Sequence, residues 1–533
     1  MILVWGLVMS GVGVIVMLGS GVSWVVEYVI FSLGGVEWSV VFLCDVVSLM
    51  FVFYVMVITV SVFVYSGAYV SWGSVRFYFL VFWFVVSMLL MVMSPSMVSI
   101  ILGWDGLGVV SYFLVVFYGG SSVDYSGMIT FLSNRLGDSV LMVSVGWLMC
   151  LSSWNFLMWD EWVMWFFVMV LLMGMTKSAQ FPFSVWLPEA MAAPTPVSAL
   201  VHSSTLVTAG VYLVMRYSVN EGCSWLVYVG LFTMLIFGAM ALWEVDGKKV
   251  IAFSTLSQLG MMFMCLGLGL KVLVFFHLLT HALFKSLLFL CMGVVIHEGG
   301  GSQDVRMMGG WASSAVVVGG VMVVSVMSLA GFPYLSGFYS KDYMMEWVWG
   351  SMQGGVIEVL IFGGLCLTVA YGVRLVKMVM LGEWGGGVVS DSGGMSSMFL
   401  VPLVSLGVLV VFSGSWMAWV LFEGSVVVSV GDKILPLVSL VVGGGVMTLL
   451  GGVVPEFLMG VWKLSGSGVS SLGLKVAGMC HILDEGWLVY GGFMAGEVVK
   501  SVSSGVVSYY GVSKHYFMIL FFMWMGIVWV MYI

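Results

Sequence analysis

The sequence predicts an all-α polytopic membrane protein with about 15–16 transmembrane helices, because a membrane-spanning helix needs roughly 20 apolar residues. Of its 533 residues, 62% are hydrophobic and only 8% are charged, whereas a soluble domain is about a quarter charged. Uncharged stretches of spanning length recur along the chain. The alternation over about ten residues that marks an outer-membrane barrel is absent from the sequence. The lipid bilayer is therefore the first expected partner.

The uncharged stretches supply the individual spans, beginning with residues 1–19. This first segment has neither a basic flank nor a small-residue cleavage site, so we expect a retained span rather than a removed signal peptide. The net charge of −8 leaves no basic surface for a nucleic acid, which excludes that partner class. The clearest later spans lie between these charged residues: Asp45 and Arg76, Arg76 and Asp105, Asp138 and Asp160, Arg306 and Lys341, Asp391 and Glu423, and Lys433 and Glu456.

The spans group into four predicted regions. Residues 1–94 form N-terminal transmembrane helices, 95–380 the core, 381–473 C-terminal transmembrane helices, and 474–533 a terminal segment. Residues 474–512 carry five charges among apolar residues and as one helix would measure about 60 Å, twice a bilayer core. We therefore expect an amphipathic segment that lies along the membrane and is followed by an uncharged anchor helix at 516–533.

A short motif occurs twice in the core. Residues 179–183 (AQFPF) and 330–334 (AGFPY) share alanine, phenylalanine, proline and a final aromatic residue, and they lie near Lys177 and Lys341. Proline breaks a helix, and such breaks persist at membrane depth only where protein or a wet cavity surrounds them. Matched breaks in two halves of a transporter indicate ion sites. Chance similarity in a low-complexity chain is the alternative.

Three charged residues lie in or beside the early core spans. Asp105 stands between two apolar runs, and its carboxylate is either a functional group inside the membrane or a helix-end charge at the headgroups. Arg135 and Asp138 are three residues apart, so they share a helix face and can pair. That pair either tunes Asp105 or is a structural ion pair at the membrane boundary.

Lys177 and His202 are candidates for proton carriers. Lys177 follows an uncharged stretch and precedes the first proline break, where burial and a nearby carboxylate together control its charge. The alternative interpretation is that the Lys177 side chain extends to the membrane surface, where its ammonium would be hydrated. His202 precedes the hydroxyl residues 203–205, a group suited to a short water chain, although a lone core histidine is the simpler interpretation.

The most specific local pattern is a polar stripe at 277, 281 and 285. His277, His281 and Lys285 recur every four residues, so a helix presents them on one face of an otherwise apolar rod. Histidine titrates near neutral pH, which suits a proton relay, although a structural network remains possible. Lys341 and Asp342 follow the second break, and as adjacent helical residues they point apart.

Several segments resemble a known family. Those at 177–183 (KSAQFPF) and 194–205 (PTPVSALVHSST) resemble the antiporter-like subunits of respiratory complex I and their Mrp-type antiporter relatives. Further segments narrow the resemblance to the chain 5 branch of that family, strongly over about residues 95–345. These are 103–106 (GWDG), 134–138 (NRLGD), 248–255 (KKVIAFST), the stripe from 277 to 285, and 337–342 (GFYSKD).

The resemblance implies two inverted repeats with broken helices and a lateral C-terminal helix beside sister antiporter-like subunits. It also implies a proton relay in the membrane midplane, with the family's usual glutamate replaced by Asp105. NADH, FMN, iron–sulfur clusters and ubiquinone would belong to partner subunits, with no cofactor or metal on this chain. The implied location is the mitochondrial inner membrane, and a composition rich in Val, Gly, Met and Trp agrees with an organelle gene. The implied relay comprises Asp105, Lys177, His202, His277, His281, Lys285 and Lys341.

The implied function is proton translocation coupled to electron transfer from NADH to ubiquinone, as a subunit without its own redox centre. The alternative is a free-standing monovalent cation/proton antiporter, because the core motifs are shared. A purely structural membrane subunit would not need lysines inside its spans.

Overall fold

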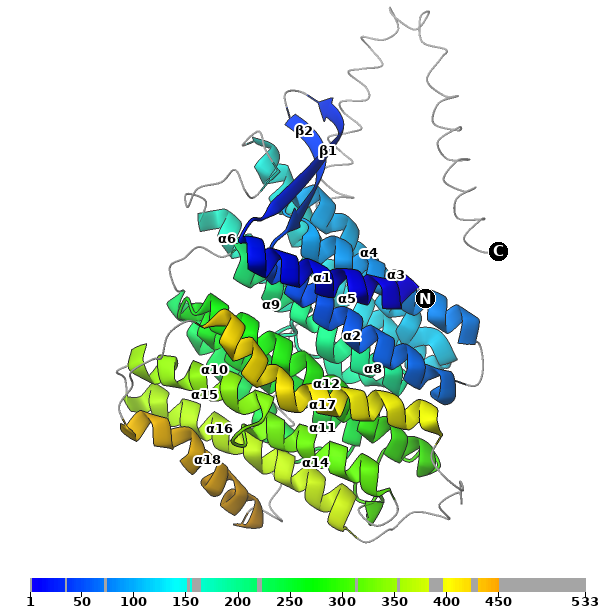
Figure 1. Ribbon diagram of the computed structural model, residues 1–533, viewed down its shortest axis with the longest axis vertical. Coiled ribbons are helices and arrows are strands. Elements are labelled where there is room, and N and C mark those ends of the chain that lie inside the picture. Colours follow the sequence, from blue (N-terminus) through cyan, green and yellow to red (C-terminus); the bar gives the residue numbers. More distant parts are fainter. Residues whose placement is uncertain are drawn as a thin grey trace, which may run out of the picture. The chain divides into compact units, whose positions relative to one another are not determined.

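The computed structural model describes residues 2–33, 36–70, 74–150, 154–155, 164–217, 223–311, 315–351, 355–382, 396–422 and 430–449 (Figure 1). All of them belong to one compact unit, Met1–Ser465. The predicted lateral segment at 474–512 and the anchor helix at 516–533 lie outside the described residues.

The helical membrane fold is confirmed. Within the described ranges, ten helices are long and apolar enough to cross a bilayer, and three shorter apolar helices accompany them. The ten candidate spans include the continuous segment Thr195–Tyr217 and do not include α5 or α18. By length alone, the helices of 18 or more residues are α1 (Ile2–Ser20), α2 (Val46–Tyr69), α3 (Ser74–Met93), α4 (Met97–Val115), α5 (Ser121–Cys150), α10 (Ser224–Ala241), α11 (Gly247–Gly267), α12 (Lys271–Glu298), α16 (Gly355–Val376), α17 (Ser397–Leu421) and α18 (Val430–Leu449). The shorter ones are η1 (Val116–Tyr118), α6 (Met164–Lys177), α7 (Trp186–Glu189), η3 (Ala190–Ala192), α8 (Thr195–Leu200), η4 (Val201–Thr205), α9 (Leu206–Tyr217), α14 (Val316–Ala330), α15 (Ser336–Ser351) and η5 (Lys377–Leu381).

In the part of the chain that the structure describes, a two-stranded sheet accompanies the helices. Strands β1 (Trp24–Leu33) and β2 (Val36–Cys44) pair antiparallel, with Trp24 opposite Cys44. The segment is rich in β-branched and aromatic residues, which favour strands, and Gly34-Gly35 lies between its two halves. Its apolar composition resembles that of a buried span, so the sequence alone did not separate this hairpin from the surrounding helices.

The centre of the bundle is α12. It contacts α2, α11, α14 and α17, which Figure 1 shows around it. The spanning portions of α11 and α12, and of the segment from α8 to α9, are wholly buried by protein. Lipid therefore faces the outer helices, while the polar stripe of α12 lies in the protein interior.

Both repeated motifs interrupt helices, as predicted. The first helix, α6, ends at Lys177, and non-helical residues 178–185 separate it from α7. The second, α14, ends at Ala330, and residues 331–335 separate it from α15. Gly331 has φ +89°, a left-handed conformation that favours glycine. Each half of the core thus contains a break beside a lysine.

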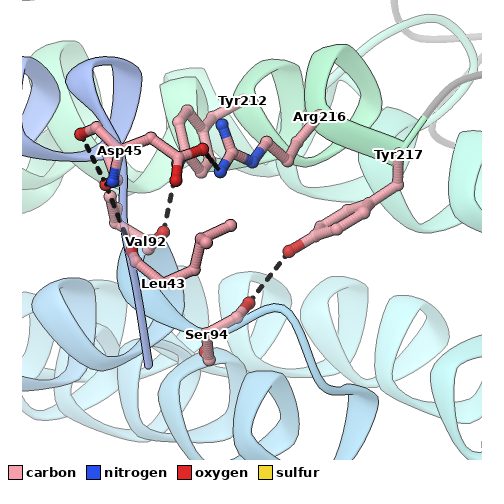
Figure 2. Close-up of polar contacts among 8 residues, drawn as sticks. Leu43, Asp45, Val92, Ser94, Tyr212, Arg216 and Tyr217 are labelled. Atoms are coloured by element: carbon pink, nitrogen blue, oxygen red, sulfur yellow. Dashed lines mark hydrogen bonds and ion pairs between the residues drawn. The ribbon is translucent and has the colours of Figure 1, made fainter. Parts of the chain in front are cut away.

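A polar joint ties α9 to α2 at one end of the bundle (Figure 2). Asp45, at the start of α2, forms an ion pair with Arg216 in the last turn of α9. Two tyrosine hydroxyls of α9 donate to carbonyl oxygens near the α3–α4 connection, Tyr212 to Val92 at 3.0 Å and Tyr217 to Ser94 at 2.9 Å. The joint holds the end of the segment that carries His202.

Small residues bring α3 and α4 together. A Cβ added at Gly103 would lie 2.6 Å from the Met91 backbone nitrogen, and one at Gly106 would lie 2.9 Å from the Ser87 Cβ. Glycine at these positions permits close approach of two helices. This packing sets the position of Asp105 on α4.

Candidate proton-translocation site

The acidic end of the candidate site lies between α4 and α5. The Arg135 guanidinium is 3.1 Å from Asp138 Oδ2 and 3.9 Å from Asp105 Oδ2. The predicted pairing of Arg135 with Asp138 is thus present, and the same arginine also approaches Asp105. Asp138 is nearly buried, with 11% of its side chain exposed, whereas 42% of Asp105 is exposed. Of the two carboxylates, Asp138 is the more enclosed by protein.

Lys177 is completely buried at the end of α6. Its Nζ donates to the Trp104 carbonyl at 3.3 Å and lies 4.8 Å from the centre of the Trp104 ring. An ammonium over an aromatic face is attracted by the ring quadrupole. The charges of Asp138 and Asp105 also act on Lys177. The ammonium is therefore held by tryptophan, within electrostatic reach of two carboxylates that Arg135 already engages.

Gly108 leaves room beside the Lys177 ammonium, since a Cβ there would lie 3.5 Å from Nζ. We expect Gly108→Ala to fold normally, because 3.5 Å is an ordinary contact distance. Its methyl group would shield one side of the ammonium from polar partners, a penalty on the order of 1 kcal/mol, or about a fivefold lower pumping rate. Proton uptake per assembled molecule in membrane vesicles measures this effect.

The matched control is Gly320→Ala on α14, where an added Cβ meets no atom within 4 Å. Alanine is the better helix former, so this variant should keep normal pumping. Equal pumping by both variants would contradict a role for the space beside Lys177.

His202 lies in η4, a π-helical turn between α8 and α9. Its ring is buried, neither ring nitrogen has a hydrogen-bond partner among the described residues, and its aromatic neighbour is Trp186 at 6.2 Å. The three hydroxyls that follow it donate to backbone carbonyls four or five residues earlier. These hydroxyls satisfy carbonyl oxygens that the wider π-helical turn leaves available. The predicted water chain would therefore have to bind the imidazole rather than these hydroxyls.

The stripe on α12 is buried as one row. His277 and His281 have ring centroids 6.2 Å apart, and His277 Nδ1 is 3.0 Å from Ser340 Oγ. Lys285 donates to the Ser254 hydroxyl on α11. The predicted helical face is therefore present, and it extends to α11 and α15 through serine hydroxyls.

Lys341 lies on α15 beside the second break, with 3% exposure. Its Nζ donates to Thr368 Oγ1 at 2.7 Å and to the carbonyl oxygens of Leu329 and Ala330, each at 3.4 Å. These two carbonyls end α14, so the helix break itself provides acceptors for a buried ammonium. The Lys341 charge acts on Lys285 and on His277, which places all three in one electrostatic group.

The structure therefore groups the predicted residues into two clusters. The acidic cluster holds Asp105, Arg135, Asp138 and Lys177, and the basic cluster holds His277, His281, Lys285 and Lys341. His202 bonds to neither cluster, although η4 packs against α12.

Some polar neighbours were missed by the sequence reasoning. Trp104, Ser254 and Thr368 bind the three lysines, and Lys248 is itself buried, donating to the Ala193 carbonyl at 3.1 Å. Lys248 and Ser254 lie in the segment at 248–255 that supports the family resemblance. The sequence gives no local signal that the first of these two adjacent lysines is buried while Lys249 is half-exposed.

Broken helices, a central helix whose spanning portion is wholly buried, and two clusters of ionisable groups that contain buried lysines define an antiporter-like membrane protein. Residues 94–370 match the family described as NADH:quinone oxidoreductase/Mrp antiporter, TM. The chain is 38% identical to NADH-ubiquinone oxidoreductase chain 5 of Anopheles gambiae, with 94% of this chain and 92% of that one covered. Identity to the same-named protein of Locusta migratoria is 42%, over 80% and 77% of the two chains. The chain belongs to the NADH-ubiquinone oxidoreductase chain 5 family.

A solved structure shares the fold. The Mrp complex from Dietzia sp. DQ12-45-1b contains a chain that superposes with a TM-score of 0.72 at 24% sequence identity. The match covers 93% of this chain and 59% of that one. The resemblance inferred from the motifs is thus confirmed by both sequence and fold.

Proposed function

We propose that the two clusters carry protons across the membrane within the proton-translocating NADH:ubiquinone oxidoreductase, of which this chain is a core membrane subunit. The relatives named chain 5 of that enzyme support the membership, and the antiporter-like fold fits proton translocation. Oxidation of NADH and reduction of ubiquinone take place in partner subunits, which hold the FMN and iron–sulfur clusters. This chain contributes titratable groups rather than electron carriers.

The carrying observation is the burial of three lysines in a bundle that spans a membrane. Lys177, Lys285 and Lys341 are between 0% and 3% exposed. A cation inside a bilayer is costly and is retained mainly on ion or proton pathways. Among the residues that the structure describes, each ammonium meets carbonyl or hydroxyl oxygens rather than a close carboxylate, so a change in its charge needs little structural rearrangement.

The proposed relay begins at Asp105 and Asp138, which Arg135 holds together. Lys177 accepts or releases a proton according to the charge of these carboxylates. His202 connects this half of the core to α12, because η4 packs on that helix. His277, His281 and Lys285 then carry the proton toward Lys341, the exit lysine.

The relay domain proposed here is 95–380, flanked by transmembrane helices at 1–94 and 381–473. Sister antiporter-like subunits are the proposed neighbours. The mitochondrial inner membrane is the proposed location, and the gene is proposed to lie in the organelle.

A blue-native gel probed for this chain tests the assembly. Migration with a very large complex supports the proposal, whereas migration as a small particle would favour the free antiporter.

The segment 474–533 is proposed to retain the chain in the complex. Truncation after residue 473 should leave the core folded, because the described bundle ends before that position, but should reduce the amount recovered in the large assembly several-fold. Comparison of detergent resistance on native gels measures this loss. Wild-type recovery of the truncated chain after detergent extraction would contradict the retention role.

A further inference from the structure

Lys285 and Lys341, on α12 and α15, each end on a hydroxyl of another helix. Lys285 donates to Ser254 on α11, and Lys341 donates to Thr368 on α16 at 2.7 Å. Both hydroxyls are buried, with Ser254 3% exposed and Thr368 fully enclosed. The two lysines of the basic cluster therefore face two neighbouring helices, α11 and α16, which contact each other.

One turn further along each helix, the two helices are joined by a second pair of hydroxyls. Ser257 lies three residues after Ser254, and Tyr371 lies three residues after Thr368. The Ser257 hydroxyl is 3.3 Å from the Tyr371 hydroxyl, and both side chains are at most 2% exposed. Residues three apart on a helix share a face, with Cβ atoms about 5–6 Å apart. Four hydroxyls thus lie in sequence between the two lysines.

Gln258 sets the direction of the central hydrogen bond. Its Nε2 donates to the Tyr371 hydroxyl oxygen at 3.3 Å. A hydroxyl that accepts from an amide keeps its own proton for another acceptor, and that acceptor is Ser257. Gln258 is itself completely buried, so water at the surface does not compete for this contact.

The position of α16 is held by its last turn. Arg374 lies three residues after Tyr371 and donates to the carbonyl oxygens of Ala241 and Glu244, at 3.2 and 2.8 Å. Ala241 is the last residue of α10, and Glu244 lies in the connection between α10 and α11. The arginine therefore anchors α16 to the α10–α11 connection and keeps Tyr371 opposite Ser257.

We propose that Ser254, Ser257, Tyr371 and Thr368 form a hydroxyl bridge that passes protons between Lys285 and Lys341, with Tyr371 as its central relay residue. This inference rests on the proposed function and names the route of one of its steps. Transfer from Lys285 to Lys341 first requires the central bond to reverse, so that Ser257 donates to Tyr371 and Tyr371 turns its own proton toward Thr368. A protonated Lys285 then releases a proton to Ser254, and each hydroxyl passes on its own proton and receives another. The neutral Lys341 amine takes up the last one, so no hydroxyl changes its net protonation.

Two intervals of the bridge, one on each helix, are a single turn long. One bridging water of the kind common in polar sites would span such an interval, once the hydroxyls on either side have rotated toward it. Serine and threonine hydroxyls of the bridge now donate to backbone carbonyls of their own helices. Each of them must turn away from its carbonyl before it can pass a proton to the next hydroxyl. Tyr371 is the one bridge hydroxyl that already points toward another helix.

The test is Tyr371→Phe, which removes the hydroxyl and keeps the ring. The intact complex is assayed in sealed membrane vesicles for the proton-to-electron ratio during NADH oxidation, normalised to assembled complex. We expect the ratio to fall as far as in Lys341→Met, with assembly retained. Tyr212→Phe is the matched control, because Tyr212 is equally buried and its hydroxyl only donates to the Val92 carbonyl. It should keep the wild-type ratio.

A second pair of variants keeps the test decisive if the Tyr371→Phe protein fails to fold. Ser257→Ala removes the facing hydroxyl in a small side chain, and Ser257→Thr keeps one. The bridge requires a lowered ratio in the alanine variant and a wild-type ratio in the threonine variant. Equal ratios in these two variants would overturn the bridge, whatever the yield of Tyr371→Phe.

The lysine variants separate failure of the bridge from failure of the proposed function. If the proton-to-electron ratio is at the wild-type value in Tyr371→Phe and Ser257→Ala but low in Lys285→Met and Lys341→Met, the bridge is refuted and the proposed function is not. If the lysine variants themselves keep the wild-type proton-to-electron ratio, proton relay by this chain is refuted, and so is the bridge.

Discussion

Lys177→Met is expected to abolish most proton pumping by the chain while the complex still assembles. Methionine fills a similar volume and packs well in irregular apolar sites, and the carboxylate of Asp138 keeps its ion pair with Arg135 when the lysine is removed. The Trp104 carbonyl, 3.3 Å from the ammonium, loses its partner. That loss costs about 1–3 kcal/mol, too little to prevent folding of a bundle of this size. Vesicle acidification at equal content of assembled complex measures the effect.

Lys249→Met is the matched control for this experiment. Lys249 is a half-exposed lysine that pairs with Asp246 at 3.3 Å at the start of α11. An exposed pair of this kind contributes about 0–1 kcal/mol, so its loss should leave both assembly and pumping near normal. A wild-type proton-to-electron ratio in Lys177→Met would refute the role of Lys177 as a carrier.

His281→Ala and Lys285→Met are expected to be strongly non-additive. Each single variant should remove most of the pumping that passes along α12, because a relay stops when one link is absent. The double variant should then lose little more than either single one, as for residues that act as a unit. The measurement is a double-mutant cycle, in which the proton-to-electron ratio is compared among the wild type, the two single variants and the double variant.

The structure sets a condition on that cycle. Lys285 is bound to Ser254 and His281 packs against Phe284, but the two side chains lie one turn apart on one face of α12 and their charges act on each other. The stability of the four proteins should therefore be measured as well, so that coupling in packing is separated from coupling in pumping. Additive losses in pumping would show that the two residues lie on independent routes.

Much of the fold was predictable from local sequence. The two proline-containing motifs mark both helix breaks, and the spacing of His277, His281 and Lys285 identifies the buried face of α12. These predictions succeed because proline chemistry and helical periodicity act within a few residues. The hairpin at 24–44 was missed because an apolar, β-branched segment satisfies either a strand or a buried span.

The partners of the site were less predictable. Ser254 and Thr368 are single hydroxyls in apolar helices, and their roles depend on helices that are distant in sequence from Lys285 and Lys341. At His202 the local structure differs from what the sequence pattern suggested for its neighbours. Its neighbouring hydroxyls indicated a polar site, but the π-helical turn directs them to backbone carbonyls.

The second break has a consequence for how the protein is made. Helix α15 has only sixteen residues and contains Lys341, Asp342 and Glu346, and it is not among the ten helices apolar enough to span a bilayer. Each such charge adds about 3 kcal/mol to the free energy of insertion at the centre of a helix.

Helix α15 therefore needs its neighbours in order to remain in the membrane. It packs on α12 and α14, which are synthesised earlier, and on α17, which is synthesised later. Its stable insertion must await α17, so the chain spends part of its biogenesis with Lys341 short of its final surroundings. Variants that weaken the contact between α15 and α17 should therefore lower the amount of protein in the membrane before they affect its activity.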